Sequence, residues 1–202
     1  MRARFIAACL LLPLVTSSLA HAQRRGNPDL VEVPSGGGER RGFWITGQVG
    51  AGGESNRLVA ERDYSRSLYK PTLALRLGGT VNPHLRLGGE LFGWFDQRGD
   101  LTESLASAMA IAQIYPLTRA GLFLKGGGGV TRAGVHDRFD VFSVSDWGFG
   151  WTAGVGYDIA VGRKLAITPV VEYMQHRFDG RDFPSYYERV LNFGLGITFQ
   201  TR

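Results

Sequence analysis

A two-residue alternation of apolar with small or polar side chains runs through most of the chain after Gly42. Side chains with this period point to opposite faces of a β-strand. The 29 glycines recur inside these apolar segments, where each would cost a helix on the order of 1 kcal/mol. The pattern therefore predicts strands. Eight segments show it: 43–51, 72–79, 85–95, 104–115, 122–130, 147–158, 165–174 and 191–199.

One of these segments, 104–115, does not reveal which of its faces is the apolar one. Alanine fills one face, while Met109 and Ile111 lie on the other. The side assignment of this fourth strand is therefore left open.

The connections between the segments alternate between long and short. The longer ones are 53–70, 97–103, 133–146 and 177–186, and the shorter ones are 81–84, 116–120 and 160–164. An up-and-down barrel in an outer membrane has this layout, with short periplasmic turns and longer external loops. We therefore predict an all-β protein: an eight-stranded antiparallel up-and-down transmembrane β-barrel over residues 42–202, with both termini on the periplasmic side.

The first residues have the three parts of an export signal. Arg2 and Arg4 form a cationic start, an apolar run of about 15 residues follows, and Ala20-His21-Ala22 is a small-residue cleavage site. The run is too short for a transmembrane helix, which needs roughly 20 residues. We predict a cleaved signal peptide over residues 1–22. Cys9, the single cysteine, lies inside it, so the mature chain has no thiol for a disulfide, a zinc site or a nucleophile.

Residues 23–41 differ in composition from the rest of the chain. They contain two prolines, a run of three glycines and four arginines without any apolar period, which predicts a flexible periplasmic leader. Without Arg2 and Arg4, the 23 basic and 18 acidic residues of the full chain leave only a mild basic excess. The basic residues are scattered, which does not favour binding to nucleic acid.

Alternation alone does not say which face of a barrel points outward, because a soluble barrel can line a ligand cavity with its apolar face. The export signal favours the membrane form. So does the other face, which is too rich in glycine and too ionic for an aqueous exterior. Aromatic residues also gather towards the strand ends, where two interfacial girdles are expected: Phe43, Phe95, Tyr115, Trp147, Tyr157, Tyr173, Tyr187 and Phe199.

Several stretches resemble the small outer-membrane barrel families typified by the transmembrane domain of outer-membrane protein A. They are 113–116, 122–129, 153–158, 165–169 and 191–199. The resemblance covers about 42–199 and implies the fold, while the activities of these families range from structural and adhesive to channel-forming and enzymatic. It also implies that the last strand is the signal recognised by the barrel-assembly machinery, although three residues follow its terminal Phe199.

An inward polar face places six charged residues in a narrow lumen: Arg76, Arg86, Glu90, Lys125, Asp158 and Glu172. Buried charges need partners. A hairpin centred on Pro83 sets Arg76 opposite Glu90 and Thr80 opposite Arg86. We therefore predict an Arg76–Glu90 ion pair within a wider plug. A narrow ion or small-solute channel is the alternative, because an eight-stranded barrel is filled by its own side chains whereas porins use about 16 to 18 strands.

A lipid A-modifying enzyme is a further alternative. In the lipid A deacylases, a His-x-Ser-Asn-x-Gly stretch precedes the last strand and a glutamate follows. His176 and Glu188 lie at comparable places, but Phe178 occupies the position of the serine nucleophile, and Ser185 lacks the spacing. We predict no catalytic residues and expect His176 at the rim or in a loop.

The longer loops carry two further groups of polar residues. His136, Asp137 and Asp140 have the chemistry of metal ligands, but such groups are common in loops by chance, so no metal or other cofactor is predicted. In the segment 53–70, four cations are suited to lipopolysaccharide phosphates: Arg57, Arg62, Arg66 and Lys70. We thus expect a monomeric integral outer-membrane protein with a structural or surface-interaction role, and an exported soluble barrel as the remaining alternative.

Overall fold

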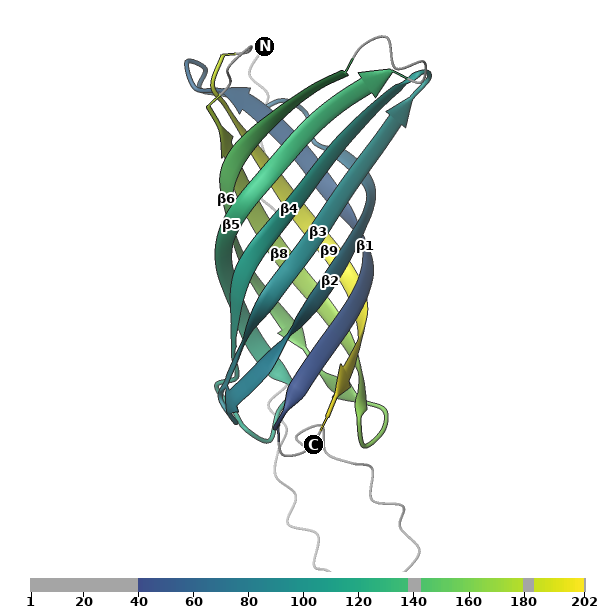
Figure 1. The fold of residues 1–202 in the computed structure, drawn as a ribbon, viewed down its shortest axis with the longest axis vertical. Coiled ribbons are helices and arrows are strands. Elements are labelled where there is room, and N and C mark those ends of the chain that lie inside the picture. Colours follow the sequence, from purple (N-terminus) through teal and green to yellow (C-terminus); the bar gives the residue numbers. More distant parts are fainter. Residues whose placement is uncertain (1–39, 138–142, 180–183, 202) are drawn as a thin grey trace, which may run out of the picture. The chain divides into compact units, whose positions relative to one another are not determined.

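The computed structural model describes residues 40–137, 143–179 and 184–201, and in these ranges the chain forms one antiparallel β-barrel (Figure 1). The strands from β1 to β6 pair in chain order, β6 pairs with β8, β8 with β9, and β9 with β1, which closes the wall. The strands are β1 Phe43–Leu58, β2 Leu68–Asn82, β3 Leu85–Arg98, β4 Leu101–Ile114, β5 Leu122–Asp137, β6 Ser143–Tyr157, β7 Ile159–Ala160, β8 Leu165–Phe178 and β9 Tyr186–Gln200. The described residues contain no helix long and apolar enough to cross a membrane.

The predicted eight-stranded barrel is confirmed, with one addition. β7 has only two residues and pairs with β8 inside the turn after β6, whereas β6 itself pairs with β8 along its length. The wall therefore consists of the eight long strands, and β7 is an extension of a turn. Both the start of β1 and the end of β9 lie at the end with the turns 83–84 and 158–164, which is the lower end in Figure 1.

The strands on the other end are longer than the sequence predicted. β1 continues to Leu58 and β2 begins at Leu68, so much of the segment expected as a loop is strand. The loop expected over 97–103 is a tight turn at Gly99, whose φ of 60° favours glycine. The strands are longer than predicted because backbone hydrogen bonds continue beyond the apolar part of the wall. In that region the sequence has no alternation of apolar and polar residues by which a strand could be predicted.

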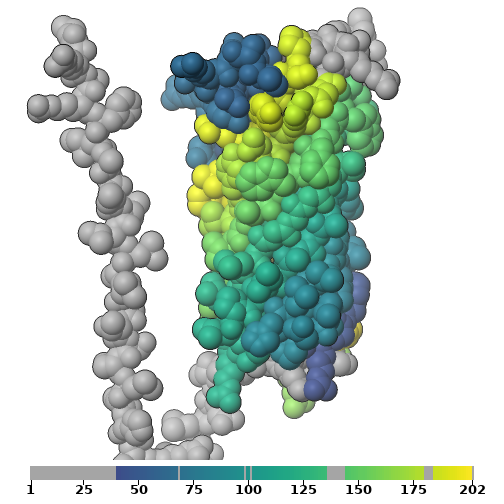
Figure 2. All heavy atoms as spheres, turned by 90° about the vertical axis from the view of Figure 1, so that its left-hand side faces the viewer, coloured from purple at the N-terminus to yellow at the C-terminus, as the bar shows by residue number. Residues whose placement is uncertain are grey.

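The outer surface is the apolar face, which is the arrangement predicted from the export signal, the ionic opposite face and the aromatic residues. Leu73, Leu91, Phe149 and Ile197 are among the exposed residues, while their neighbours in sequence point inward. Figure 2 shows this outer face covered by side chains. In β4, the undecided strand, Met109 and Ile111 are buried inside and the alanines face outward. The facing strand β5 has Gly127 and Gly129 next to Ile111 and Met109, which gives the larger side chains room.

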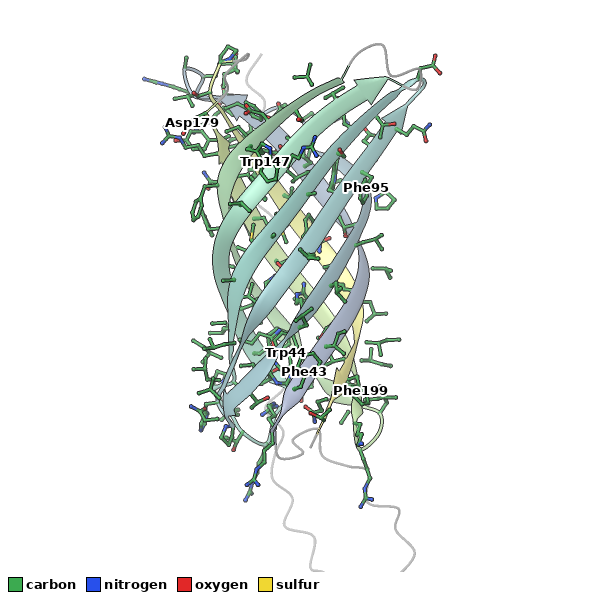
Figure 3. All side chains as sticks on the ribbon, in the orientation of Figure 1. Phe43, Trp44, Phe95, Trp147, Asp179 and Phe199 are labelled. Carbon is green, nitrogen blue, oxygen red and sulfur yellow. The ribbon has the colours of Figure 1, made fainter. Side chains whose placement is uncertain are left out.

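Most aromatic residues of the predicted girdles lie on the outside. Phe43 and Phe199 lie near the lower end of the barrel in Figure 3, and Phe95 and Trp147 near the upper end. Tyr115 was assigned to a girdle wrongly. It is fully buried in the lumen, because it continues the inward phase of Gln113 and Ile111 just beyond the end of β4.

Candidate functional site

The barrel interior holds the charged residues that the sequence placed there. At mid-height, Arg76 of β2, Glu90 of β3, Lys125 of β5 and Glu172 of β8 form what we call the central ion cluster. Arg76 Nη2 lies 3.0 Å from both carboxylate oxygens of Glu172, and its Nε donates to Glu90. Lys125 Nζ lies 2.6 Å from Glu90 Oε2 and also contacts Glu172. Two cations thus neutralise two carboxylates.

Two amides and a hydroxyl complete this cluster. Gln48 Oε1 accepts from Arg76 at 2.6 Å, and Gln48 Nε2 donates to Glu172 at 3.1 Å. Asn192 donates to Glu172 at 2.8 Å and accepts from Thr72 at 2.6 Å. These side chains supply hydrogen bonds that water would otherwise provide, which buried charges require. The sequence analysis did not single out Gln48 and Asn192, although both carry the inward phase of their strands.

A second polar group, the periplasmic cluster, consists of Arg86, Tyr115, Asp158 and Thr168. Arg86 Nη1 lies 2.8 Å from the Tyr115 hydroxyl and 3.2 Å from Asp158 Oδ2. The Tyr115 hydroxyl donates to the same carboxylate at 2.8 Å, and Thr168 donates to its other oxygen at 2.9 Å. Arg86 and Asp158 are therefore brought together, but they belong to a different layer from the other four predicted charges.

Arg40 covers this cluster at the periplasmic end. Its guanidinium lies 3.9 Å from the centre of the Tyr115 ring, and it donates to the carbonyl oxygens of Thr118, at 2.9 Å, and Ala120. Burial lowers the pKa of this guanidinium from its ordinary value, but an arginine remains a cation in proteins. The sequence analysis places Arg40 in the predicted leader, residues 23–41. In the structure its side chain is buried against the barrel.

Above the central ion cluster the interior contains a cluster of apolar side chains. The residues of this apolar layer are Ala74, Phe92, Trp94, Leu105, Met174, Phe178 and Val190. His176 also lies inside rather than at the rim, is fully buried, and has two ring nitrogens without a hydrogen-bond partner. Phe178 belongs to the apolar layer, so no hydroxyl stands beside the imidazole at the position that a deacylase would need.

The end of the barrel opposite the chain termini, which is expected to be extracellular, contains a cavity of about 540 Å³ that we call the vestibule. Trp94 and Leu105 of the apolar layer form part of its lining. Its remaining lining residues are Glu54, Asn56, Arg57, Leu58, Glu61, Glu103, Ser104, Ala133, Gly134, Val135, Pro184, Tyr186 and Glu188. The acidic members of this lining were not predicted as a site.

The four cations expected to meet lipopolysaccharide lie in different environments. Arg62 and Arg66 are exposed in the loop 59–67. Arg57 is half-buried, with its guanidinium 4.9 Å from the ring of Tyr64. Lys70 lies in β2 and not in a loop, and its ammonium is 2.6 Å from Asp96. Of the four cations, Arg62 and Arg66 therefore lie in the loop, whereas Arg57 and Lys70 lie in strands.

The residues considered for a metal lie at the end of β5 and beyond it. His136 and Asp137 are backbone members of β5, and Asp140 lies outside the described residues. Within the part of the chain that the structure describes, no group of three or more His, Cys, Asp or Glu side chains is placed to hold a metal ion.

Comparison with known families identifies the barrel. Residues 7–199 match the family described as "Outer membrane protein beta-barrel domain". The chain belongs to this family. Membership places the protein in the outer membrane, so the inner surface of this barrel is the lumen of a membrane barrel and its apolar exterior faces lipid.

Two solved structures have a similar fold. Neisserial surface protein A is 17% identical, with a TM-score of 0.55, and the match covers 79% of this chain and 97% of that one. Ail, the attachment invasion locus protein of Yersinia pestis, is 15% identical, with a TM-score of 0.51, over 79% of this chain and 99% of that one. A comparison with curated proteins found no match. At these identities the likeness concerns the fold alone.

Proposed function

We propose that this member of the family has a structural or surface-interaction role, with a lumen closed to solutes by its charge pairs. The observation that carries the proposal is the central ion cluster. Its four charged side chains come from β2, β3, β5 and β8, which lie on different sides of the barrel, and they meet in its interior. The periplasmic cluster lies below it and the apolar layer above it, and these additional layers support a lumen without an open axial path.

Planar-bilayer recording tests the closure. We expect the purified protein to give no unitary current steps at neutral pH and moderate salt. The double variant Arg76→Ala/Glu90→Ala removes one cation and one carboxylate together, and so leaves the charge of the cluster unchanged. We expect this variant to conduct. Reproducible steps from the unaltered protein would refute closure and establish the alternative, a narrow channel.

One observation favours that alternative. Each carboxylate of the central ion cluster contacts both Arg76 and Lys125. Because two pairings are available, a cation can leave one carboxylate and keep the other. A channel of this kind would open without losing every ion pair. If the unaltered protein gave unitary current steps and Arg76→Ala abolished them, the central ion cluster would be part of the conducting path.

The surface role rests on the exposed cations of the loop 59–67. Guanidinium groups bind phosphates through paired hydrogen bonds, and the outer leaflet presents lipopolysaccharide phosphates to this loop. We expect Arg62→Ala/Arg66→Ala to weaken binding to lipopolysaccharide vesicles. Arg163→Ala is the matched control, because Arg163 is exposed in a turn at the opposite end. If the unaltered protein and both variants bound the vesicles equally, Arg62 and Arg66 would have no part in lipopolysaccharide binding.

The proposed role involves no catalysis. His176 is buried among residues that include Phe178, and neither of its ring nitrogens has a hydroxyl partner. We expect lipid A from cells that overproduce the protein to give an unchanged mass spectrum. Loss or gain of an acyl chain that depends on His176 would establish the enzyme instead. Recognition of β9 by the assembly machinery and a monomeric state remain predictions.

A further inference from the structure

The vestibule has a concentration of carboxylates that the closed-lumen proposal does not use. Glu54 comes from β1, Glu103 from β4 and Glu188 from β9, and all three line the cavity. Arg57 also lines it, but its guanidinium is stacked against the rings of Tyr64 and Tyr187. Among the charged residues that the structure describes in this lining, four are glutamates, Glu61 being the fourth, and one is an arginine.

Glu188 is the critical member of this group. The residue is only 6% exposed, and within the described ranges its carboxylate has no hydrogen bond or ion pair. The charges that act on it belong to Glu54 and Glu103 and have its own sign. Burying an ionised carboxylate without a compensating partner is costly. The vestibule thus contains a buried acceptor that lacks a cation.

The lower part of the same cavity is apolar and aromatic. Trp94 and Leu105 belong to both the cavity lining and the apolar layer, and Ala133 and Tyr186 pack against that layer. Trp94 is held in place by its indole N–H, which donates to the carbonyl of Gly52 at 3.2 Å. A ligand that enters from outside would meet carboxylates and a rigid apolar floor in one space.

We propose that the vestibule binds a small amphipathic organic cation, with an ammonium group against Glu188 and an apolar or aromatic part on Trp94 and Leu105. The cavity of about 540 Å³ lies within the roughly 300–1,000 Å³ typical of small-molecule sites. A metal ion fits less well, because no group of three or more ligating side chains is arranged for one among the described residues. An organic cation uses the carboxylate and the apolar floor together.

The test uses two aromatic probes of similar shape, phenethylammonium and the uncharged 2-phenylethanol. Each is titrated into the isotopically labelled full barrel in detergent micelles, and the indole N–H signals are followed by NMR. We expect phenethylammonium to shift the Trp94 signal in a saturable way, with an affinity at least tenfold higher than that of 2-phenylethanol. The Trp44 signal serves as an internal reference, because Trp44 lies in another buried cluster with Met109 and Ile111.

Variants then locate the charge that matters. Glu188→Gln keeps the shape of the side chain, and we expect it to weaken phenethylammonium binding at least tenfold. Asp100→Asn removes an exposed carboxylate from a turn at the same end of the barrel, and we expect it to leave binding unchanged. Heat-modifiable gel mobility shows whether each variant is folded. The absence of saturable binding, equal binding of the two probes, or equal losses from the two variants would each overturn the proposal.

Discussion

Lys125 of β5 and Glu90 of β3 form an ion pair across the barrel interior, with Nζ and Oε2 2.6 Å apart, although strand β4 separates their strands in the wall. Lys125 also contacts Glu172 of β8. A single ammonium therefore joins two sides of the barrel. The ion pairs of the interior therefore do not join only neighbouring strands of one hairpin. For this reason we expect a substitution of Lys125 to affect the stability of the barrel.

We expect Lys125→Met to destabilise the barrel by about 3–5 kcal/mol, because it leaves Arg76 alone with two buried carboxylates. Methionine keeps most of the apolar stem, so the loss reports the charge. Urea unfolding in lipid vesicles, followed by heat-modifiable gel mobility, measures the free energy of unfolding. Lys164→Met is the control, since Lys164 is exposed in a periplasmic turn. Equal stabilities of the two variants would show that the ammonium has no such role.

Arg76 and Glu90 also allow a double-mutant cycle. Each single substitution, Arg76→Gln or Glu90→Gln, leaves a buried charge with fewer partners, whereas the double variant removes both. We expect the double variant to lose about 1–3 kcal/mol less than the sum of the two single losses. The measurement is again unfolding in vesicles. Strictly additive losses would mean that the two side chains do not act on each other.

The Tyr115 hydroxyl connects Arg86 to Asp158 in the periplasmic cluster. We expect Tyr115→Phe to cost about 1–3 kcal/mol, because buried polar groups lose a hydrogen-bond partner. Tyr157→Phe removes a hydroxyl of the same kind from a side chain that is exposed on the barrel exterior and should be close to neutral. A larger loss at Tyr157 than at Tyr115 would contradict this account.

The strands, their order and the phase of most of them follow from alternation, because each strand of a barrel has one face towards the lumen. The second hairpin shows how far this reaches: Arg76 pairs with Glu90 and Thr80 with Arg86, in the register that the Pro83 turn predicts. The inward face of β4 was not predicted, because alanine and methionine are both compatible with lipid. Once Ile111 is placed inside, the same phase places Tyr115 inside as well.

Alternation does not predict how high along the barrel axis a side chain lies, or at which angle around that axis. Lys125 and Glu172 lie on strands that are not neighbours, and their contact depends on the stagger of all the strands between them. The vestibule could not be predicted from alternation either, because Glu54 and Glu188 lie in segments whose sequence lacks an apolar period. Their strands form through backbone pairing, which a residue pattern does not record.

Gly194 offers a test of how the central ion cluster is fitted into the barrel. It lies in β9, and a Cβ built there would be 2.1 Å from Nε2 of Gln48. Gln48 is the amide between Arg76 and Glu172, so Gly194→Ala forces it out of place, and we expect a loss of about 1–3 kcal/mol from overpacking. Gly47→Ala in the exterior of β1, where a Cβ meets nothing within 4 Å, should be neutral or slightly stabilising. Adding Gln48→Ala to Gly194→Ala removes the clash, so this double variant should be no less stable than Gln48→Ala alone. A loss that persists in the double variant would place the strain in the backbone of β9 and not in the fit of Gln48.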